Sequence, residues 1–135
     1  MKLFLPLLLL LLDLNLVTTN QCFSSDNSEL TTAVFRYTLE DCTNTPDCEV
    51  GQIYGYPISS WCTGNITDMA FLFRDKETFN EDLSGWDTSN VVNMYKMFEG
   101  AKLFDGDISK WQVGRVTNMR SMVSCCGDAS LYHVY

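Results

Sequence analysis

The chain has 135 residues and a formal net charge of −8, from 17 acidic and 9 basic residues. A chain of this length forms one small domain. Its lysines and arginines form no cluster that could neutralise a row of phosphates. The composition therefore argues against nucleic-acid partners and against anionic membrane surfaces.

The N-terminus carries one lysine and then the apolar run "LFLPLLLLLL" before Asp13. A positive start followed by such a run is typical of a secretory signal peptide. Asp13 interrupts the run too early for a membrane-spanning helix, which needs about 18–20 apolar residues. We predict a signal peptide over residues 1–20, cleaved between Val17 and Gln21. The alternative is an uncleaved anchor, and we expect no membrane contact other than through this segment.

Residues 21–57 are expected to form an N-terminal helical cap with a cysteine-bracketed turn. Asp26 is suited to the N-cap of a helix, and Glu29 follows three residues later as in a capping box. The helix is predicted over residues 26–41, as a lid on the repeats that follow. Its apolar side chains fall at helical spacing on one face: Leu30, Ala33, Val34 and Tyr37.

All six cysteines follow the predicted signal peptide: Cys22, Cys42, Cys48, Cys62, Cys125 and Cys126. An even number of cysteines in a small secreted chain favours disulfides over metal sites or free thiols. The short, turn-rich stretch "CTNTPDC" predicts a bond between Cys42 and Cys48. The neighbours Cys125 and Cys126 are expected to reach two different partners, and with His133 they lack the spacing of a usual zinc site.

A repeat of 25 residues occupies the second half of the chain. Such a period indicates stacked supersecondary units that bury a shared core. We divide it into units 58–82, 83–107 and 108–123, followed by a degenerate C-terminal cap over 124–135. Positions that are 25 residues apart in successive units form a column. The columns expected to form the repeat core are the tryptophans and the methionines: Trp61, Trp86, Trp111, Met69, Met94 and Met119.

Each unit is interpreted as one coil of a short right-handed solenoid with an α/β fold. The stretch "DLSGW", residues 82–86, is predicted to supply a small parallel strand. Residues 91–101 carry apolar side chains at helical spacing, so a short helix is expected there. We expect the tryptophans to stack in a dry interior, because each ring buries about 150–250 Å². The alternative is an exposed tryptophan ladder that binds ligands.

The segment "WDTSNVVNMYKMFEGAKLFDGDISKW", residues 86–111, resembles the 25-residue repeat of BspA-like leucine-rich-repeat surface proteins. A similar repeat occurs in mycoplasma surface lipoproteins, and the resemblance extends over residues 28–123. It implies a leucine-rich-repeat-like solenoid, surface display and protein–protein contact, without catalysis. The chain departs from the pattern at Cys62 and Gln112, where the repeat has aspartate, and at Arg115, where it has asparagine.

The sequence offers no set of a nucleophile and a base for catalysis. The single histidine, His133, stands two residues from the end of the sequence. We therefore predict a non-enzymatic protein without a metal or another cofactor. Glu81 and Asp82, and likewise Asp105 and Asp107, fall in matching loops and are interpreted as a solvated acidic edge. A calcium site made from these carboxylates is the alternative hypothesis.

The sequon "NIT" makes Asn65 the candidate for N-glycosylation, in a bend from which a glycan could project. Together these features predict a secreted or surface-displayed, leucine-rich-repeat-like interaction or adhesion module. Its partner would be a protein or a glycan at the cell surface. The alternative is a small, disulfide-stabilised structural or defence-type secreted protein.

Overall fold

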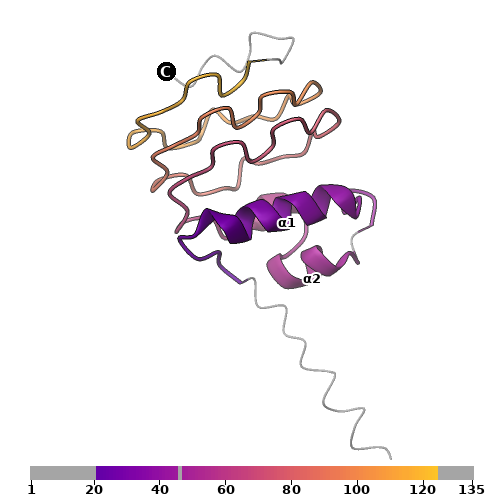
Figure 1. Cartoon of the computed structure of the whole chain (residues 1–135). Helices are drawn as coiled ribbons and strands as arrows, with labels where there is room; N and C mark the ends of the chain where they lie inside the picture. Colours follow the sequence, from indigo (N-terminus) through magenta and orange to yellow (C-terminus); the bar gives the residue numbers. More distant parts are fainter. Residues whose placement is uncertain (1–20, 46, 125–135) are drawn as a thin grey trace, which may run out of the picture.

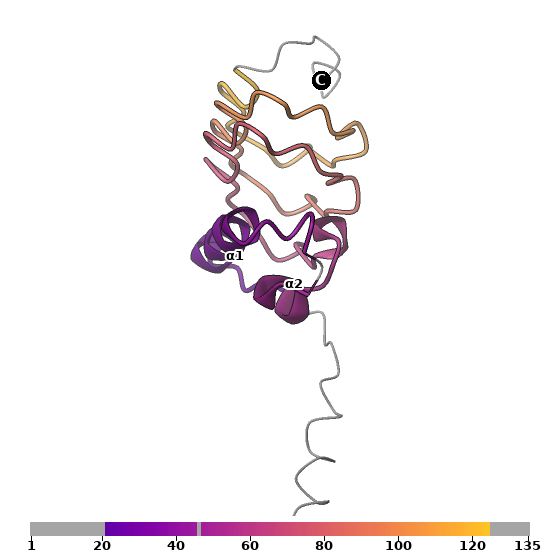
Figure 2. The same ribbon diagram turned by 90° about the vertical axis from the view of Figure 1, so that its right-hand side faces the viewer.

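The computed structural model describes residues 21–45 and 47–124. Its helices are α1 (Asn27–Leu39), α2 (Glu49–Tyr54) and the 3₁₀ helix η2 (Ile58–Ser60). In Figure 1, α1 and α2 lie together at one end of the molecule, and the repeats stack above them as irregular coils. The described chain ends at the opposite end of the stack, and the view in Figure 2 agrees.

Helix α1 forms where the sequence predicts it and begins with a side-chain cap. The carboxylate of Asp26 accepts a hydrogen bond from the amide of Ser28 at 3.0 Å. Glu29 does not close a capping box with Asp26, because its carboxylate accepts instead from the amide and the hydroxyl of Ser24. The four side chains assigned to the apolar face are all buried.

The cap has a second layer that the sequence pattern did not predict. The ring of Phe23 is fully buried and stacks on Tyr54 of α2, with 4.4 Å between the ring centroids. A disulfide joins Cys22 to Cys62 and so ties the segment before α1 to the first coil. This bond explains why a cysteine replaces the aspartate of the repeat at position 62. The predicted bond between Cys42 and Cys48 is also present.

Neighbouring coils are joined by a ladder of parallel bridges, in which each coil contributes a single residue. Asp68 forms a parallel bridge with Asn93, which forms another with Asn118. The same hydrogen bond recurs one repeat later: the amide of Met69 donates to the carbonyl of Asn93, and the amide of Met94 donates to that of Asn118, both at 2.8 Å. The 25-residue period is therefore the length of chain between successive rungs.

The predicted α/β leucine-rich-repeat solenoid is wrong. The described residues contain isolated bridges but no strand. Helices α1 and α2 precede the first repeat unit, and the 3₁₀ helix η2 forms only its first three residues. Residues 82–86 form a turn instead of a strand, and residues 91–101 form turns instead of a helix.

Local backbone chemistry explains this irregularity. The Asn93 side-chain oxygen accepts the amide hydrogen of Tyr95 at 3.1 Å, which bends the chain directly after the rung. Lys96 then adopts a left-handed conformation with φ of 53°, and Gly100 adopts φ of 80°. Neither a strand nor a right-handed helix can continue through such residues. Phe71 and Ser121 have similar φ at the position of Lys96 in the other coils.

Aromatic rings fill the interior of the stack. The indole of Trp61 stacks on that of Trp86, with centroids 6.3 Å apart, and Phe73 stacks on Phe98 at 5.3 Å. Trp111 stacks on Phe98 at 6.2 Å. The three indoles are 2%, 3% and 6% exposed, so the rings lie in the core rather than forming an exposed ladder.

Each inner indole also reaches back to the preceding coil. The Nε1–H of Trp86 donates to the carbonyl of Ile58 at 2.8 Å, and that of Trp111 donates to Leu83 at 3.1 Å. Both acceptors lie 28 residues before their tryptophan. The tryptophan column therefore fixes the register between coils by hydrogen bonding as well as by packing.

The first two coils approach each other closely at Gly85. A Cβ atom at this position would overlap the backbone carbonyl oxygen of Ser59, which cannot move aside as a side chain could. Gly85→Ala is expected to lower the free energy of unfolding by about 1–3 kcal/mol. Gly114→Ala is the matched control, because a Cβ there meets nothing within 4 Å. Equal urea midpoints for the two variants would contradict the close approach.

Candidate interaction surface

One exposed surface of the stack, which we call the ladder face, lies along the bridged residues. The turns after Asp68 and Asn93 place successive side chains of each coil outside the core. Successive coils bring these side chains into columns that are 25 residues apart. The ladder face consists of Thr67, Phe71, Arg74, Val92, Tyr95, Lys96, Glu99, Thr117 and Arg120, of which none is fully buried.

An aromatic pair occupies the ladder face. The ring of Phe71 is edge-on to that of Tyr95, with centroids 5.2 Å apart, and Phe71 is 43% exposed. The guanidinium of Arg74 lies 5.4 Å from the Phe71 centroid, and the ammonium of Lys96 lies 5.5 Å from that of Tyr95. A cation beside each ring holds the pair in place while leaving Phe71 in contact with solvent.

Charged groups on the ladder face form a small network. Glu99 pairs with Arg74 at 3.1 Å and with Lys96 at 2.6 Å. The hydrogen bond to Glu99 raises the pKa of Lys96, so its ammonium stays charged across the physiological range. Arg120 is exposed, and its guanidinium has no partner among the described residues. The amide of Asn93 donates to both carboxylate oxygens of Asp68 at 3.2 Å.

The acidic loops lie elsewhere, and the carboxylates of Glu81, Asp82 and Asp107 accept hydrogen bonds within the fold. Glu81 accepts hydrogen bonds from the hydroxyl groups of Tyr37, at 2.8 Å, and Thr43, which joins the first coil to α1 and the turn after it. The hydrogen-bond partner of Asp105 is Asn80, whose side-chain oxygen accepts the Asp105 amide. Asp82 caps its own turn by accepting the amide of the residue two positions later, and Asp107 does the same.

A family model described as "Mycoplasma protein of unknown function, DUF285" matches residues 19–130, which is most of the chain. The chain belongs to the DUF285 family. No curated protein and no solved structure matches it. Membership agrees with the resemblance to mycoplasma-type surface repeat proteins, while the narrower BspA-like assignment stays a prediction.

The turn carboxylates of this DUF285 chain make its stability depend on pH. Hydrogen bonds from the following serines lower the pKa values of Asp82, Asp87 and Asp107 in the folded state. Such groups stabilise the fold above their unfolded pKa, and that contribution is lost as the pH falls through the lower folded pKa.

We therefore expect a constant melting temperature from pH 7 to about pH 4.5 and a progressive fall below about pH 4. The double variant Asp82→Asn, Asp107→Asn should show a shallower fall in a calorimetric pH series. A profile as steep as that of the wild type would show that these two turns do not contribute.

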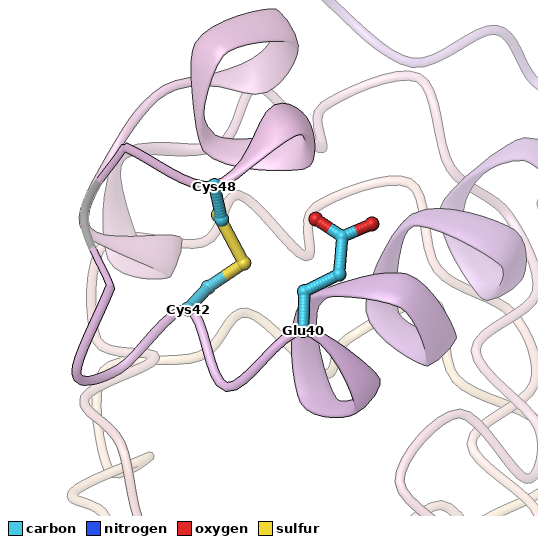
Figure 3. A group of neighbouring side chains, drawn as sticks. All are labelled: Glu40, Cys42 and Cys48. Carbon is cyan, nitrogen blue, oxygen red and sulfur yellow. A yellow bond between two sulfur atoms is a disulfide. The ribbon is translucent and has the colours of Figure 1, made fainter.

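The calcium hypothesis finds no support in the geometry. Among the described residues, the only group of three or more histidine, cysteine, aspartate or glutamate side chains close enough to share an ion is Glu40, Cys42 and Cys48. Figure 3 shows that the two sulfur atoms of this group are bonded to each other, with the Glu40 carboxylate beside them. A disulfide leaves no thiolate to bind a metal. The group is therefore a structural disulfide next to α1, with a carboxylate beside it.

Asn65 is exposed, and its side-chain amide donates to the carbonyl of Phe23 at 3.1 Å. Asn90 makes the equivalent bond to Gly64 at 2.8 Å, so the column of asparagines has a structural role. At the third position, Arg115 replaces this bond by donating to the oxygen of Asn90. Glycosylation of Asn65 stays a prediction.

Several predicted features lie outside the described residues. They are the signal peptide over 1–20, most of the C-terminal cap over 124–135, and the side chains of Cys125, Cys126 and His133. None of the helices within the described part has the length and apolar character needed to cross a membrane.

The ladder face was not predicted from the sequence, although the sequence contains one signal of it. Positions 70, 95 and 120 hold alanine, tyrosine and arginine, and positions 71, 96 and 121 hold phenylalanine, lysine and serine. The residue type differs between units at these positions, whereas it is constant at neighbouring positions. A variable position beside constant ones is a candidate for surface contact.

Proposed function

We propose that this DUF285 chain is a non-catalytic interaction module, secreted or displayed at a surface, that binds a protein or glycan through the ladder face. The observation that carries this proposal is the exposed pair of Phe71 and Tyr95 with a cation beside each ring. Aromatic side chains and arginine are enriched in the parts of interfaces that supply most of the binding energy.

The charge of the ladder face supports the same function. Arg74 and Lys96 pair with Glu99, Arg74 also lies 3.4 Å from Asp75, and Arg120 adds a further cation, although the whole chain carries 17 acidic and 9 basic residues. Charged groups of both signs beside an aromatic pair favour a partner with charged or polar groups around an apolar or sugar-ring surface.

The proposed location has support from the disulfides. Cys22–Cys62 and Cys42–Cys48 are bonds that persist in oxidising compartments and are rare in reducing ones. Family membership agrees with a surface protein. A secretory signal over residues 1–20 would bring the chain to that compartment.

Binding can be tested by presenting the mature chain to arrays of surface proteins and of glycans. The variant Phe71→Asn, Tyr95→Ala removes both rings, and asparagine tolerates the left-handed backbone at position 71. It is expected to weaken a saturable interaction at least tenfold, equivalent to about 1.4 kcal/mol.

Ile53→Ser on α2 is the matched control, because Ile53 is 38% exposed and belongs to the cap rather than to the coils that form the ladder face. Equal losses in both variants would contradict the assignment of the ladder face. The absence of any saturable partner would favour the alternative, a disulfide-stabilised protein whose repeat serves stability alone.

A further inference from the structure

A polar cleft lies beside the end of α1, and we call it the cap cleft. It has a volume of about 240 Å³. Three segments form its walls: the end of α1, the turn at residues 41–44, and the loop of the first coil at residues 78–81. None of the ladder-face residues lines it. Its polar side chains include Asp41, Thr43, Asn44, Thr78 and Glu81.

The cap cleft is held in shape by contacts that need no ligand. The Glu81 carboxylate accepts hydrogen bonds from the hydroxyl groups of Tyr37, at 2.8 Å, and Thr43. The disulfide between Cys42 and Cys48 holds the turn beside the end of α1 (Figure 3). Because these walls are already ordered, a ligand does not have to order them, and the entropic cost of binding is lower.

Several polar groups in the cap cleft keep hydrogen-bonding capacity. Within the described part of the chain, the Asp41 carboxylate accepts only from the side-chain amide of Asn44, at 3.0 and 3.1 Å. The Thr78 hydroxyl and the Asn44 side-chain oxygen have no partner in residues 21–45 and 47–124. A carboxylate has about four acceptor sites, and a hydroxyl both donates and accepts. The cleft therefore offers donors as well as acceptors.

The charges of the cap cleft restrict the ligand further. Asp41 and Glu81 form no ion pair with a lysine or an arginine among the described residues. An anionic ligand would therefore meet two unneutralised carboxylates and be repelled. A metal ion is not favoured either, because in the same part of the chain these two carboxylates belong to no group of three ligating side chains that lie close together.

Size and ring chemistry indicate which ligand fits. Pockets for drug-sized ligands have volumes of about 300–1,000 Å³, so the cap cleft has room for one small ring rather than a chain of rings. Tyr37 and Phe79 contribute aromatic surface to its walls, and such surface attracts C–H groups. A sugar ring combines C–H groups with hydroxyls that both donate and accept, whereas an ammonium group only donates.

The first coil departs from the repeat at the cap cleft. Thr78 and Glu81 correspond to Leu103 and Gly106 one repeat later, whereas the aromatic residue between them recurs at position 104. The core residue of this loop is therefore kept, and the two polar residues are specific to the coil beside the cap. This pattern is expected if these polar side chains act at the junction between cap and coil and not in every coil.

We propose that the cap cleft binds a single sugar unit without negative charge, such as the terminal unit of a glycan. Asp41 and Glu81 accept hydrogen bonds from hydroxyl groups of the sugar, and the Thr78 hydroxyl donates to one of its oxygens. Tyr37 and Phe79 contact its C–H groups. This proposal is independent of the ladder face and of the partner proposed for it.

The first test is a titration of the full chain, nitrogen-15-labelled and with both disulfides formed. The probes are the methyl glycosides of glucose, galactose, mannose and N-acetylglucosamine. We expect saturable shifts with at least one of them, confined to the amide signals of residues 41–44 and 78–81. The absence of saturable shifts with all four, up to their solubility limits, would overturn the proposal, and so would saturable shifts located elsewhere.

Charged probes test the ligand class. Methyl glucuronide carries a carboxylate, and tetramethylammonium carries a positive charge without a hydroxyl. Both are expected to bind at least tenfold more weakly than the neutral sugar that binds best. Tighter binding of methyl glucuronide would show that the two carboxylates do not face the ligand. Tighter binding of tetramethylammonium would assign the cleft to cations instead of sugars.

Two variants test the residues. Asp41→Asn removes a carboxylate and keeps a residue that tolerates the left-handed backbone at this position, where φ is 51°. Thr78→Val removes a hydroxyl from an exposed side chain while keeping its shape. Each is expected to weaken sugar binding at least tenfold, with amide signals outside the cleft unchanged. Wild-type affinity in both folded variants would overturn the proposal.

The ladder-face variant Phe71→Asn, Tyr95→Ala is the matched control. It leaves every residue of the cap cleft in place, so it should bind the sugar with the affinity of the wild type. A loss equal to that of Asp41→Asn would overturn the assignment of sugar binding to the cap cleft.

Discussion

Replacing Trp86 with alanine is expected to lower the free energy of unfolding by about 3–5 kcal/mol. Trp86 is 3% exposed, stacks on Trp61 and lies 5.7 Å from the ring of Phe73. Its removal leaves a cavity between two coils and removes one of the two hydrogen bonds to the Ile58 carbonyl, which also accepts the Trp61 amide. Small domains are stable by only about 5–15 kcal/mol, so urea denaturation should show the variant close to unfolding.

Two further variants separate the contributions of the indole. Trp86→Phe keeps an aromatic ring but loses the hydrogen bond to the Ile58 carbonyl, so an intermediate loss is expected. Leu103→Ala, at a side chain that is 60% exposed, should change stability by less than about 0.5 kcal/mol. If Trp86→Ala were as stable as Leu103→Ala, the indole would not lie in a packed core.

The two disulfides are expected to contribute unequally. Cys22 and Cys62 are 40 residues apart, and Cys42 and Cys48 are 6 apart. Because a longer loop restricts the unfolded chain more, replacing the first pair with serines should cost about 4 kcal/mol and replacing the second about 2 kcal/mol. The first pair also holds Phe23 beneath Trp61, where their ring centroids are 5.5 Å apart.

Chemical denaturation of both double-serine variants provides the measurement. Each serves as the control for the other, since both lose two sulfur atoms and one disulfide bond. If the short loop proved the more stabilising, the stability of the cap would come from the α1–α2 connection rather than from the tie between cap and coils.

The sequence predicted the core of this fold better than its secondary structure. The 25-residue spacing correctly placed Trp61 against Trp86, because only a stacked layer can bury the apolar side of each coil. Helix α1 followed from an N-cap residue and a continuous apolar face. Helix α2 was missed because its six residues include a glycine and no complete apolar face.

The strand and helix predictions failed for a reason that the sequence contains. The polar column of Asp68, Asn93 and Asn118 consists of residues whose side chains bond to the backbone two positions ahead. These bonds compete with both helix and strand. The apolar residues that follow point inward because the chain turns tightly, and their spacing imitates a helical period.

The ladder face was missed for a different reason. Residue types recur in a column because their side chains pack in the core, so the repeat pattern predicts core residues. Phe71, Tyr95 and Arg120 belong to columns without a consensus, and their proximity depends on the rung geometry. Only the stacked coils bring the Phe71 ring within 5.2 Å of the Tyr95 ring.

Nuclear Overhauser contacts between residues 25 apart test the stacked-coil account most directly. The structure predicts contacts between the indoles of Trp61 and Trp86, whose centroids are 6.3 Å apart, and between the rings of Phe73 and Phe98 at 5.3 Å. Contacts between the rung residues Asp68 and Asn93 should accompany them. A folded chain without these contacts, or with its indoles in solvent, would contradict the account.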